Sequence, residues 1–177
     1  MAPALLSPTQ ALAADPSSTA AMPAAPVAAA RSALQVRQGL RVGGIGLMVR
    51  DEDGSELTEV PVIHRLPNAP AWLCGICNLH GLLVPVFDLA TYAGLPPQAP
   101  KRPMLLVLSH GADAAGVLID GMPQRLRFGP GQAADPHAAP AALLPLLRGA
   151  ALLGNHLWFD LDRPALLDAL ETSLKTS

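Results

Sequence analysis

Short apolar runs separated by turn-forming residues dominate the chain from Leu34 onward. Gly, Pro, Asn and Asp interrupt the runs at short intervals, as at Gly43-Gly44 and Gly154-Asn155. Each run has the length of a strand rather than of a helix, so the pattern predicts a small all-β barrel or sandwich. The predicted strands are residues 34–42, 46–50, 57–65, 76–79, 82–88, 104–109, 114–119, 123–128, 147–153 and 156–160.

Helical signals occur at two places along this pattern. Asp162 is a good N-cap residue, and Pro164 fits the first turn of the helix that would follow. A single apolar stripe then predicts that this C-terminal helix docks on the core; it consists of Leu166, Leu167, Leu170 and Leu174. A shorter helix is expected after Asp88, from Leu89 to Ala93.

The tripeptide Phe-Asp-Leu occurs twice, at 87–89 and at 159–161. Each copy is expected to end a strand and open a helix, and each follows a hairpin that contains a glycine, Gly81 or Gly154. Two similar half-domains would produce such an echo, although three matching residues also arise by chance.

Residues 1–34 differ in composition from the rest of the chain. They consist mainly of Ala, Pro, Ser and Thr, and carry charge only at Asp15 and Arg31. A segment with so little to bury predicts a disordered tail, which leaves one domain over residues 35–175. The segment has no basic start, and Ala4-Leu5-Leu6 is too short for the apolar part of a signal peptide, so we expect a cytoplasmic protein.

Composition argues against two classes of partner. Of the 177 residues 50% are hydrophobic, 15% are charged and 3% are aromatic, and the net charge is −2. Such a chain has neither the basic stripe nor the stacking platforms of a nucleic-acid-binding protein. No run of about 18 apolar residues is present, so we expect no direct membrane insertion.

The main candidate for chemistry is Cys74-Gly75-Ile76-Cys77 with His80. A C-x-x-C pair indicates thiol redox work, and the histidine would make three possible metal ligands. However, residues three apart in a strand face opposite sides, and a structural zinc site takes a fourth ligand. The simpler interpretation is two small buried side chains, so we predict no enzyme activity, no cofactor and no metal. Phosphate-loop, metalloprotease and serine-hydrolase motifs are absent as well.

Four further histidines show no partner pattern and are expected on the surface or in loops; they are His64, His110, His137 and His156. The acidic turn at Asp51, Glu52 and Asp53 lacks the additional ligands of a Ca²⁺ loop.

A longer motif covers residues 66–89, which read LPNAPAWLCGICNLHGLLVPVFDL. This stretch resembles the signature of the CheW family, P-N-x-P-x-W-[LIV]-x-G-x-x-N-L-R-G-x-[LIV]-[LIV]-P-V-x-D-L. The resemblance continues more weakly at 104–108, 116–120 and 154–170, and spans about residues 36–172. It implies an all-β fold of two SH3-like five-stranded β-barrel subdomains with a C-terminal helix.

The same resemblance implies a non-catalytic scaffold that couples the tip of a methyl-accepting chemoreceptor to a CheA-type histidine kinase at membrane-associated receptor arrays. Chemotaxis and the twitching branch of the family, the PilI-like members serving type IV pili, are both compatible with it. The implied receptor- or kinase-binding residues are Glu56, Asn78, Leu79, His80 and Gly81.

His80 departs from the family pattern, which has Arg in N-L-R-G. An Arg carries a permanent charge and a fork of donors, whereas a neutral His has one donor, so partner choice or coupling strength is expected to differ. Glu56 matches a family acidic residue linked to receptor contact, but a solvated strand-end charge is the simpler alternative. Two further hypotheses stay open: a thiol or metal protein, and a degenerate CheW-like domain without receptor binding.

Overall fold

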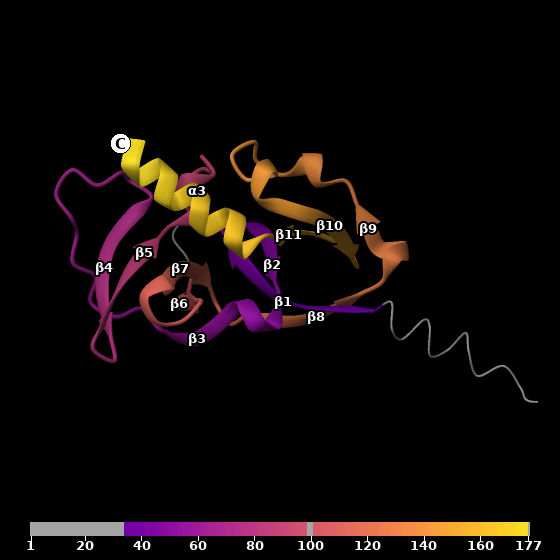
Figure 1. Ribbon diagram of the computed structural model, residues 1–177. Coiled ribbons are helices and arrows are strands. Elements are labelled where there is room, and N and C mark those ends of the chain that lie inside the picture. The colour runs from indigo at the N-terminus through magenta and orange to yellow at the C-terminus, as the bar shows by residue number, and fades with distance from the viewer. Residues whose placement is uncertain (1–33, 99–100, 177) are drawn as a thin grey trace, which may run out of the picture. The chain divides into compact units, whose positions relative to one another are not determined.

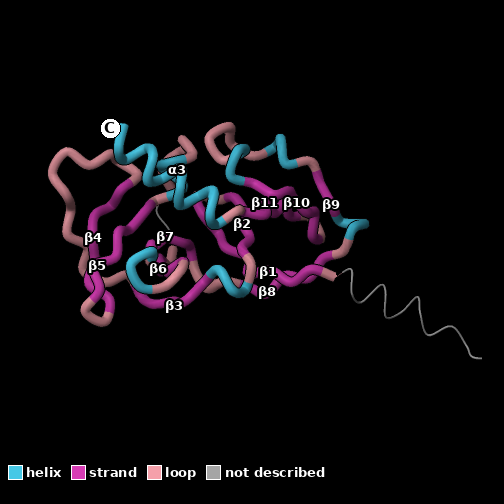
Figure 2. Tube along the Cα trace, in the orientation of Figure 1, coloured by secondary structure: helices cyan, strands magenta, loops and turns pink. Residues whose placement is uncertain are grey.

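The computed structural model describes residues 34–98 and 101–176 (Figure 1). The tail predicted over residues 1–34 lies outside these residues except for Leu34, and its state stays a prediction. Within these residues the α-helices are α2 (Leu89–Tyr92) and α3 (Arg163–Thr176), and short 3₁₀ turns lie between strands (Figure 2). The strands are β1 (Gln35–Val42), β2 (Ile45–Val49), β3 (Gly54–Glu59), β4 (Leu73–Leu79), β5 (Leu82–Phe87), β6 (Pro103–Leu108), β7 (Ala115–Asp120), β8 (Gln124–Phe128), β9 (Ala133–Ala134), β10 (Leu147–Leu153) and β11 (His156–Leu161).

The strands form two sheets with the same plan. One sheet has the order β3-β6-β7-β5-β4, and the other has the order β8-β1-β2-β11-β10 with β9 added at its edge. In each sheet one parallel pair, β5 with β7 or β11 with β2, sits among antiparallel pairs. The predicted fold class is confirmed: the protein is mostly β, with two SH3-like subdomains and a C-terminal helix. The two-residue strand β9 was not predicted.

The repeated Phe-Asp-Leu tripeptide falls at equivalent places in the two sheets. Phe87 of β5 lies opposite Val117, and Phe159 of β11 lies opposite Leu47, each in the parallel pair of its sheet. The residue before each phenylalanine faces a glycine, Gly116 or Gly46. The echo therefore follows the internal repeat of the fold.

One part of that prediction was wrong. Asp88 does cap α2, because its side chain accepts the backbone N–H groups of Ala90 and Thr91. Asp160, in contrast, is buried within β11, and the cap of α3 is Asp162, which accepts the N–H of Ala165. The second helix therefore opens two residues later than the tripeptide indicates.

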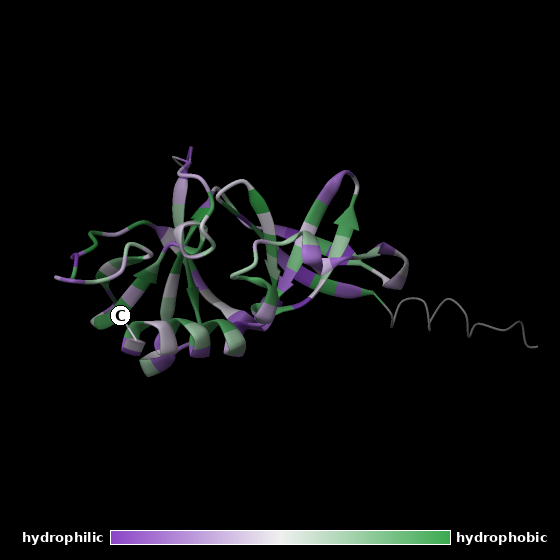
Figure 3. Ribbon diagram, turned by 90° about the horizontal axis from the view of Figure 1, so that it is seen from above, coloured by the Kyte–Doolittle hydropathy of each residue, from purple (hydrophilic) through white to green (hydrophobic). Residues whose placement is uncertain are grey.

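Three hydrophobic clusters fill the molecule, because alternate residues of each strand face opposite sides of a sheet. The largest combines both sheets with α3, and includes Leu47, Leu106 and Leu166. A second cluster lies on the other face of the five-stranded sheet around Cys77 and Leu105, and a third surrounds Trp158 in the six-stranded sheet. Along α3, hydrophobic and hydrophilic residues alternate (Figure 3). Leu166 and Leu170 are fully buried and Leu167 packs against the largest cluster, so the predicted stripe departs only at Leu174, which is 37% exposed.

The motif residues anchor the segment that leads into β4. The Trp72 ring stacks on Phe87 at a centroid distance of 6.1 Å and meets Tyr92 edge-on at 5.4 Å. Its carbonyl accepts the N–H of Asp88 at 2.8 Å. Leu73 is buried beside it, and Trp72 itself is partly buried against the largest cluster.

Two sequence predictions about strands need correction. The strand predicted over 57–65 is β3 (Gly54–Glu59), and beyond it only His64 pairs, as an isolated bridge to Ile76. The nearly continuous apolar run 82–87 predicts a strand buried on both faces, but Leu82 and Leu83 are 50% and 73% exposed. Pro85 lies just outside the pairing of β5 with β7, which begins at Val86, so that pairing needs no donor from it.

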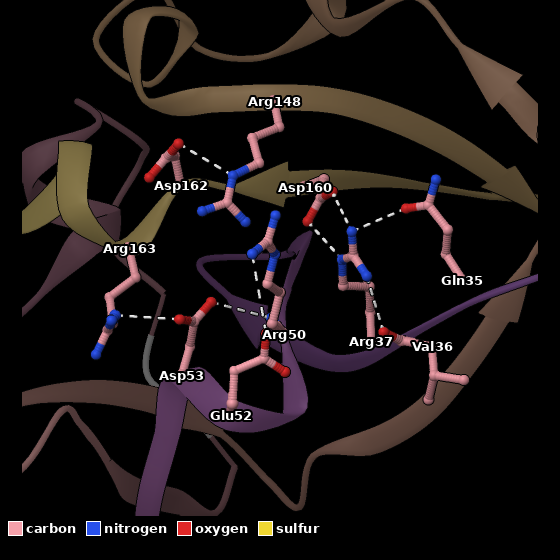
Figure 4. A network of polar contacts seen from close by, with 10 residues as sticks. All are labelled: Gln35, Val36, Arg37, Arg50, Glu52, Asp53, Arg148, Asp160, Asp162 and Arg163. Atoms are coloured by element: carbon pink, nitrogen blue, oxygen red, sulfur yellow. Dashed lines mark hydrogen bonds and ion pairs between the residues drawn. The ribbon is translucent and has the colours of Figure 1, made fainter.

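Ion pairs join the start of α3 to both sheets (Figure 4). Buried Asp53, which precedes β3, lies 3.0 Å from the Nε atom of Arg163 and accepts the N–H of Arg50 at 3.2 Å. Asp162 accepts a 3.0 Å hydrogen bond from Arg148 of β10. In the six-stranded sheet, Arg37 donates to both oxygens of Asp160, at 2.9 and 3.1 Å. The acidic turn is thus structural, with Asp53 as its buried member.

Within the described residues, no helix is both long and apolar enough to cross a membrane.

Candidate partner-binding site

The β4–β5 hairpin presents four of the five predicted site residues. Leu79 pairs with Leu82, so the connection is a two-residue turn made of His80 and Gly81. Both have positive φ, 51° and 87°, as a type I′ turn requires. Asn78 holds the turn, because its Oδ1 accepts the N–H of Gly81 at 2.9 Å. Asn78 and Gly81 therefore shape the turn, and His80 is the side chain that it presents to solvent.

The fifth predicted residue, Glu56 of β3, contacts His80 directly. Its Oε1 lies 3.0 Å from the His80 Nε2. An ionised carboxylate can only accept, so Nε2 is the donor and carries a hydrogen. The His80 side chain is 76% exposed and that of Glu56 is 38% exposed. Both groups therefore remain available to a partner while paired with each other.

This contact requires the five-stranded sheet to close on itself. In the sheet order β3 and β4 are the two outermost strands, yet Glu56 belongs to one and His80 follows the other. The bridge between His64 and Ile76 closes the same gap further along β4. Barrel closure thus brings together two residues that are 24 positions apart in the chain.

A shallow hollow of about 150 Å³ lies beside the pair. Its apolar wall is formed by Leu79, Leu82, Val84 and Val107, with Ala114 adjoining. Its polar rim consists of Glu56, His80, Ser109 and His110. An apolar surface with a polar rim is the usual anatomy of a protein-binding patch.

Sequence reasoning missed seven of the residues that line this hollow, among them His110 and Leu82. His110 was expected only as a surface or loop histidine; it is exposed in the loop after β6, as expected, but it also lines the hollow. Leu82 begins a predicted strand, and nothing in its apolar run marks it as a surface residue. Their part in the hollow follows from barrel closure, for which the sequence pattern carries no signal.

The two cysteines do not form a ligand set with His80. Both are free thiols, and both pack against the second hydrophobic cluster, although they are three residues apart in a strand. A β-bulge between Leu73 and Gly75 shifts the alternation of side chains and puts them on one face, contrary to the sequence expectation. Burial raises the pKa of both thiols, which disfavours the thiolate that redox or metal chemistry uses. Among the described residues, no group of three or more His, Cys, Asp and Glu side chains is arranged to hold a metal.

One known family model covers both the hairpin motif and most of the fold. The family model of the CheW-like domain matches residues 54–171, which include the hairpin, the hollow and most of α3. The chain belongs to the CheW family.

Three individual proteins show how far the likeness extends. Over 114 residues the chain is 27% identical to the chemotaxis protein CheW of Klebsiella aerogenes, covering 63% of this chain and 69% of that protein. Over 84 residues it is 31% identical to the protein PilI of Pseudomonas aeruginosa, covering 46% and 47% of the two chains. The crystal structure of the scaffolding protein TtCheW from Thermoanaerobacter tengcongensis superposes with a TM-score of 0.62 at 16% identity, covering 72% and 88%. This last likeness establishes the fold alone.

Proposed function

We propose that this protein is a non-catalytic scaffold that couples chemoreceptors to a CheA-type histidine kinase. The observation that carries the proposal is the match of the CheW-like domain over residues 54–171, with the hairpin motif presented on the surface. Relatives named for chemotaxis and PilI are both represented, so we extend the proposal to chemotaxis or type IV pilus signalling. The proposed location is the cytoplasmic side of a membrane-associated receptor array.

The surface that we assign to the receptor tip is the Glu56–His80 pair with the hollow beside it. Two features support this assignment. The turn is rigid, because Asn78 and the positive φ angles fix its backbone, so binding orders little extra chain. Apolar side chains are exposed on the same hairpin, at Leu82 and Leu83, where an amphipathic helix can bury them.

The first test is binding of the full chain to two purified fragments from the same cell. One fragment is the regulatory domain of the CheA-type kinase, and the other is the helical-hairpin signalling tip of a chemoreceptor. We expect both to bind together in a ternary complex, measured by analytical ultracentrifugation. Failure of both fragments to bind would contradict the scaffold proposal.

Charge reversal at two positions of β3 tests whether the assigned surface, rather than the strand in general, binds the receptor tip. Glu56→Lys is expected to weaken binding of the receptor tip about tenfold or more, because it breaks the pair with His80 and repels it when protonated. Glu59→Lys changes an exposed residue three positions along the same strand, makes the same change in net charge and is expected to leave binding intact. Equal losses in the two variants would show that the surface is assigned wrongly. Kinase binding without receptor binding in the unaltered chain would identify a degenerate domain.

A further inference from the structure

The hollow beside the hairpin is lined by two imidazoles and one carboxylate. Its titratable residues are Glu56 from β3, His80 from the turn and His110 from the loop after β6. Asp113, in the 3₁₀ turn that follows His110, lines a different groove, beside α3. With both imidazoles neutral the rim has a charge of −1, and with both protonated it has +1. A charge reversal within a hollow this small changes which partner groups it favours.

The contact with Glu56 determines how His80 changes on protonation. Because Nε2 donates to the carboxylate, the neutral ring has no hydrogen on Nδ1, which is then an acceptor. Protonation adds a hydrogen to Nδ1 and turns that nitrogen into a charged donor. The ring is 76% exposed, so a bound partner can meet this nitrogen directly. Protonation also converts the contact with Glu56 into a full ion pair.

We infer that His80 makes receptor binding dependent on pH, with the protonated imidazole as the form that binds the receptor tip. The inference rests on the proposed function and deepens it. Nδ1–H of His80 would donate to an acceptor on the tip, a backbone carbonyl or a carboxylate, while Nε2–H holds Glu56 and the apolar wall of the hollow covers the adjoining helix face. The interaction is then tighter when the His80 imidazole is protonated than when it is neutral.

Two substitutions of His80 fix the charge of the side chain at this position. His80→Arg supplies a charged donor at every pH, and is expected to bind the tip equally well at pH 6.0 and pH 8.0. His80→Gln supplies a neutral side chain, and is expected to bind weakly at both values. For the unaltered chain we expect binding about three- to fivefold tighter at pH 6.0, the size of one exposed charge-assisted contact.

The experiment is titration calorimetry with the helical-hairpin receptor tip at the two pH values, with the kinase regulatory domain as a second ligand. His110→Gln is the matched control, and it is expected to keep most of the pH dependence. A pH dependence in His80→Arg as large as in the unaltered chain would overturn the inference, as would its disappearance in His110→Gln alone. If none of these proteins binds the tip, the proposed receptor coupling fails and the inference with it. Tip binding that is independent of pH in the unaltered chain overturns the inference alone.

Discussion

At position 75 the backbone conformation and the packing around it allow only glycine. Its φ is +138°, and a Cβ there would lie 2.2 Å from the backbone oxygen of His64. That oxygen accepts the N–H of Ile76 in the bridge that closes the five-stranded barrel. The glycine in the motif is therefore explained by backbone packing rather than by contact with a partner.

Gly75→Ala is accordingly expected to lower the free energy of unfolding by more than about 3 kcal/mol, from backbone strain and overpacking together. Gly131→Ala is the control, because a Cβ there has open space around it. Urea unfolding followed by circular dichroism measures both variants. Similar small losses in the two variants would contradict the close approach of His64.

Cys74 and Cys77 give a prediction about thiol reactivity. Burial raises the pKa of both thiols above the ordinary value near 9, so little thiolate is present at neutral pH. Alkylation by iodoacetamide at pH 7.5 is expected to be far slower in the native protein than in urea, and slowest at Cys77, which is fully buried. The alkylation rate of the native protein should still be rising at pH 9. Rapid native labelling, or stoichiometric zinc after purification, would favour the thiol or metal hypothesis instead.

Elements that have a strong local signal are predictable from this sequence, whereas those that depend on pairing are not. β10 (Leu147–Leu153) matches its predicted bounds, and the turn at His80-Gly81 follows from the residues flanking it. The predicted range of β3 extended too far along the chain because the apolar alternation continues past Glu59. The strand ends there, since Pro61 has no N–H to pair with a neighbouring strand. β9 has two alanines, which carry no strand signal. For the candidate site, the residues of the hairpin could be predicted from the sequence. That Glu56 and His110 lie close to His80 depends on how the barrel closes.

α3 offers a direct test of which face it buries. Leu170 is fully buried in the largest cluster, and Leu174, one turn further along, is 37% exposed. Leu170→Ala is expected to lower the free energy of unfolding by about 2–4 kcal/mol, and Leu174→Ala by less than about 1 kcal/mol. Thermal unfolding by differential scanning calorimetry compares them. Equal costs would mean that the helix is rotated relative to this description.

At the start of α3, the contact between Asp53 and Arg163 connects the helix to the strands of both sheets. Asp53 is buried and precedes β3, Arg163 opens α3, and Arg50 at the end of β2 donates its N–H to the same carboxylate. The Arg163 Nε lies 3.0 Å from Oδ1 without the alignment of a hydrogen bond, so the attraction is that of an ion pair. The fixed relation of helix and sheets therefore rests in part on one charge pair whose carboxylate is buried.

The two members of this pair are expected to contribute to stability jointly rather than independently. Arg163→Met leaves the Asp53 carboxylate buried and unpaired, which typically costs about 3 kcal/mol or more. The double variant Asp53→Asn with Arg163→Met is expected to be more stable than the sum of the single losses predicts. Urea unfolding of the four proteins completes the cycle. Strict additivity would show that the two side chains do not interact.

The central claim, that the protein couples a receptor to a kinase without chemistry of its own, is tested most directly by reconstitution. Receptor in nanodiscs, the CheA-type kinase and this protein are mixed, and the rate of kinase autophosphorylation from ATP is measured with each component left out in turn. Our account predicts that the protein alone is inactive and that the kinase comes under receptor control only when it is present, an effect lost in Glu56→Lys and kept in Glu59→Lys. Kinase activity that is the same with and without this protein would contradict the account.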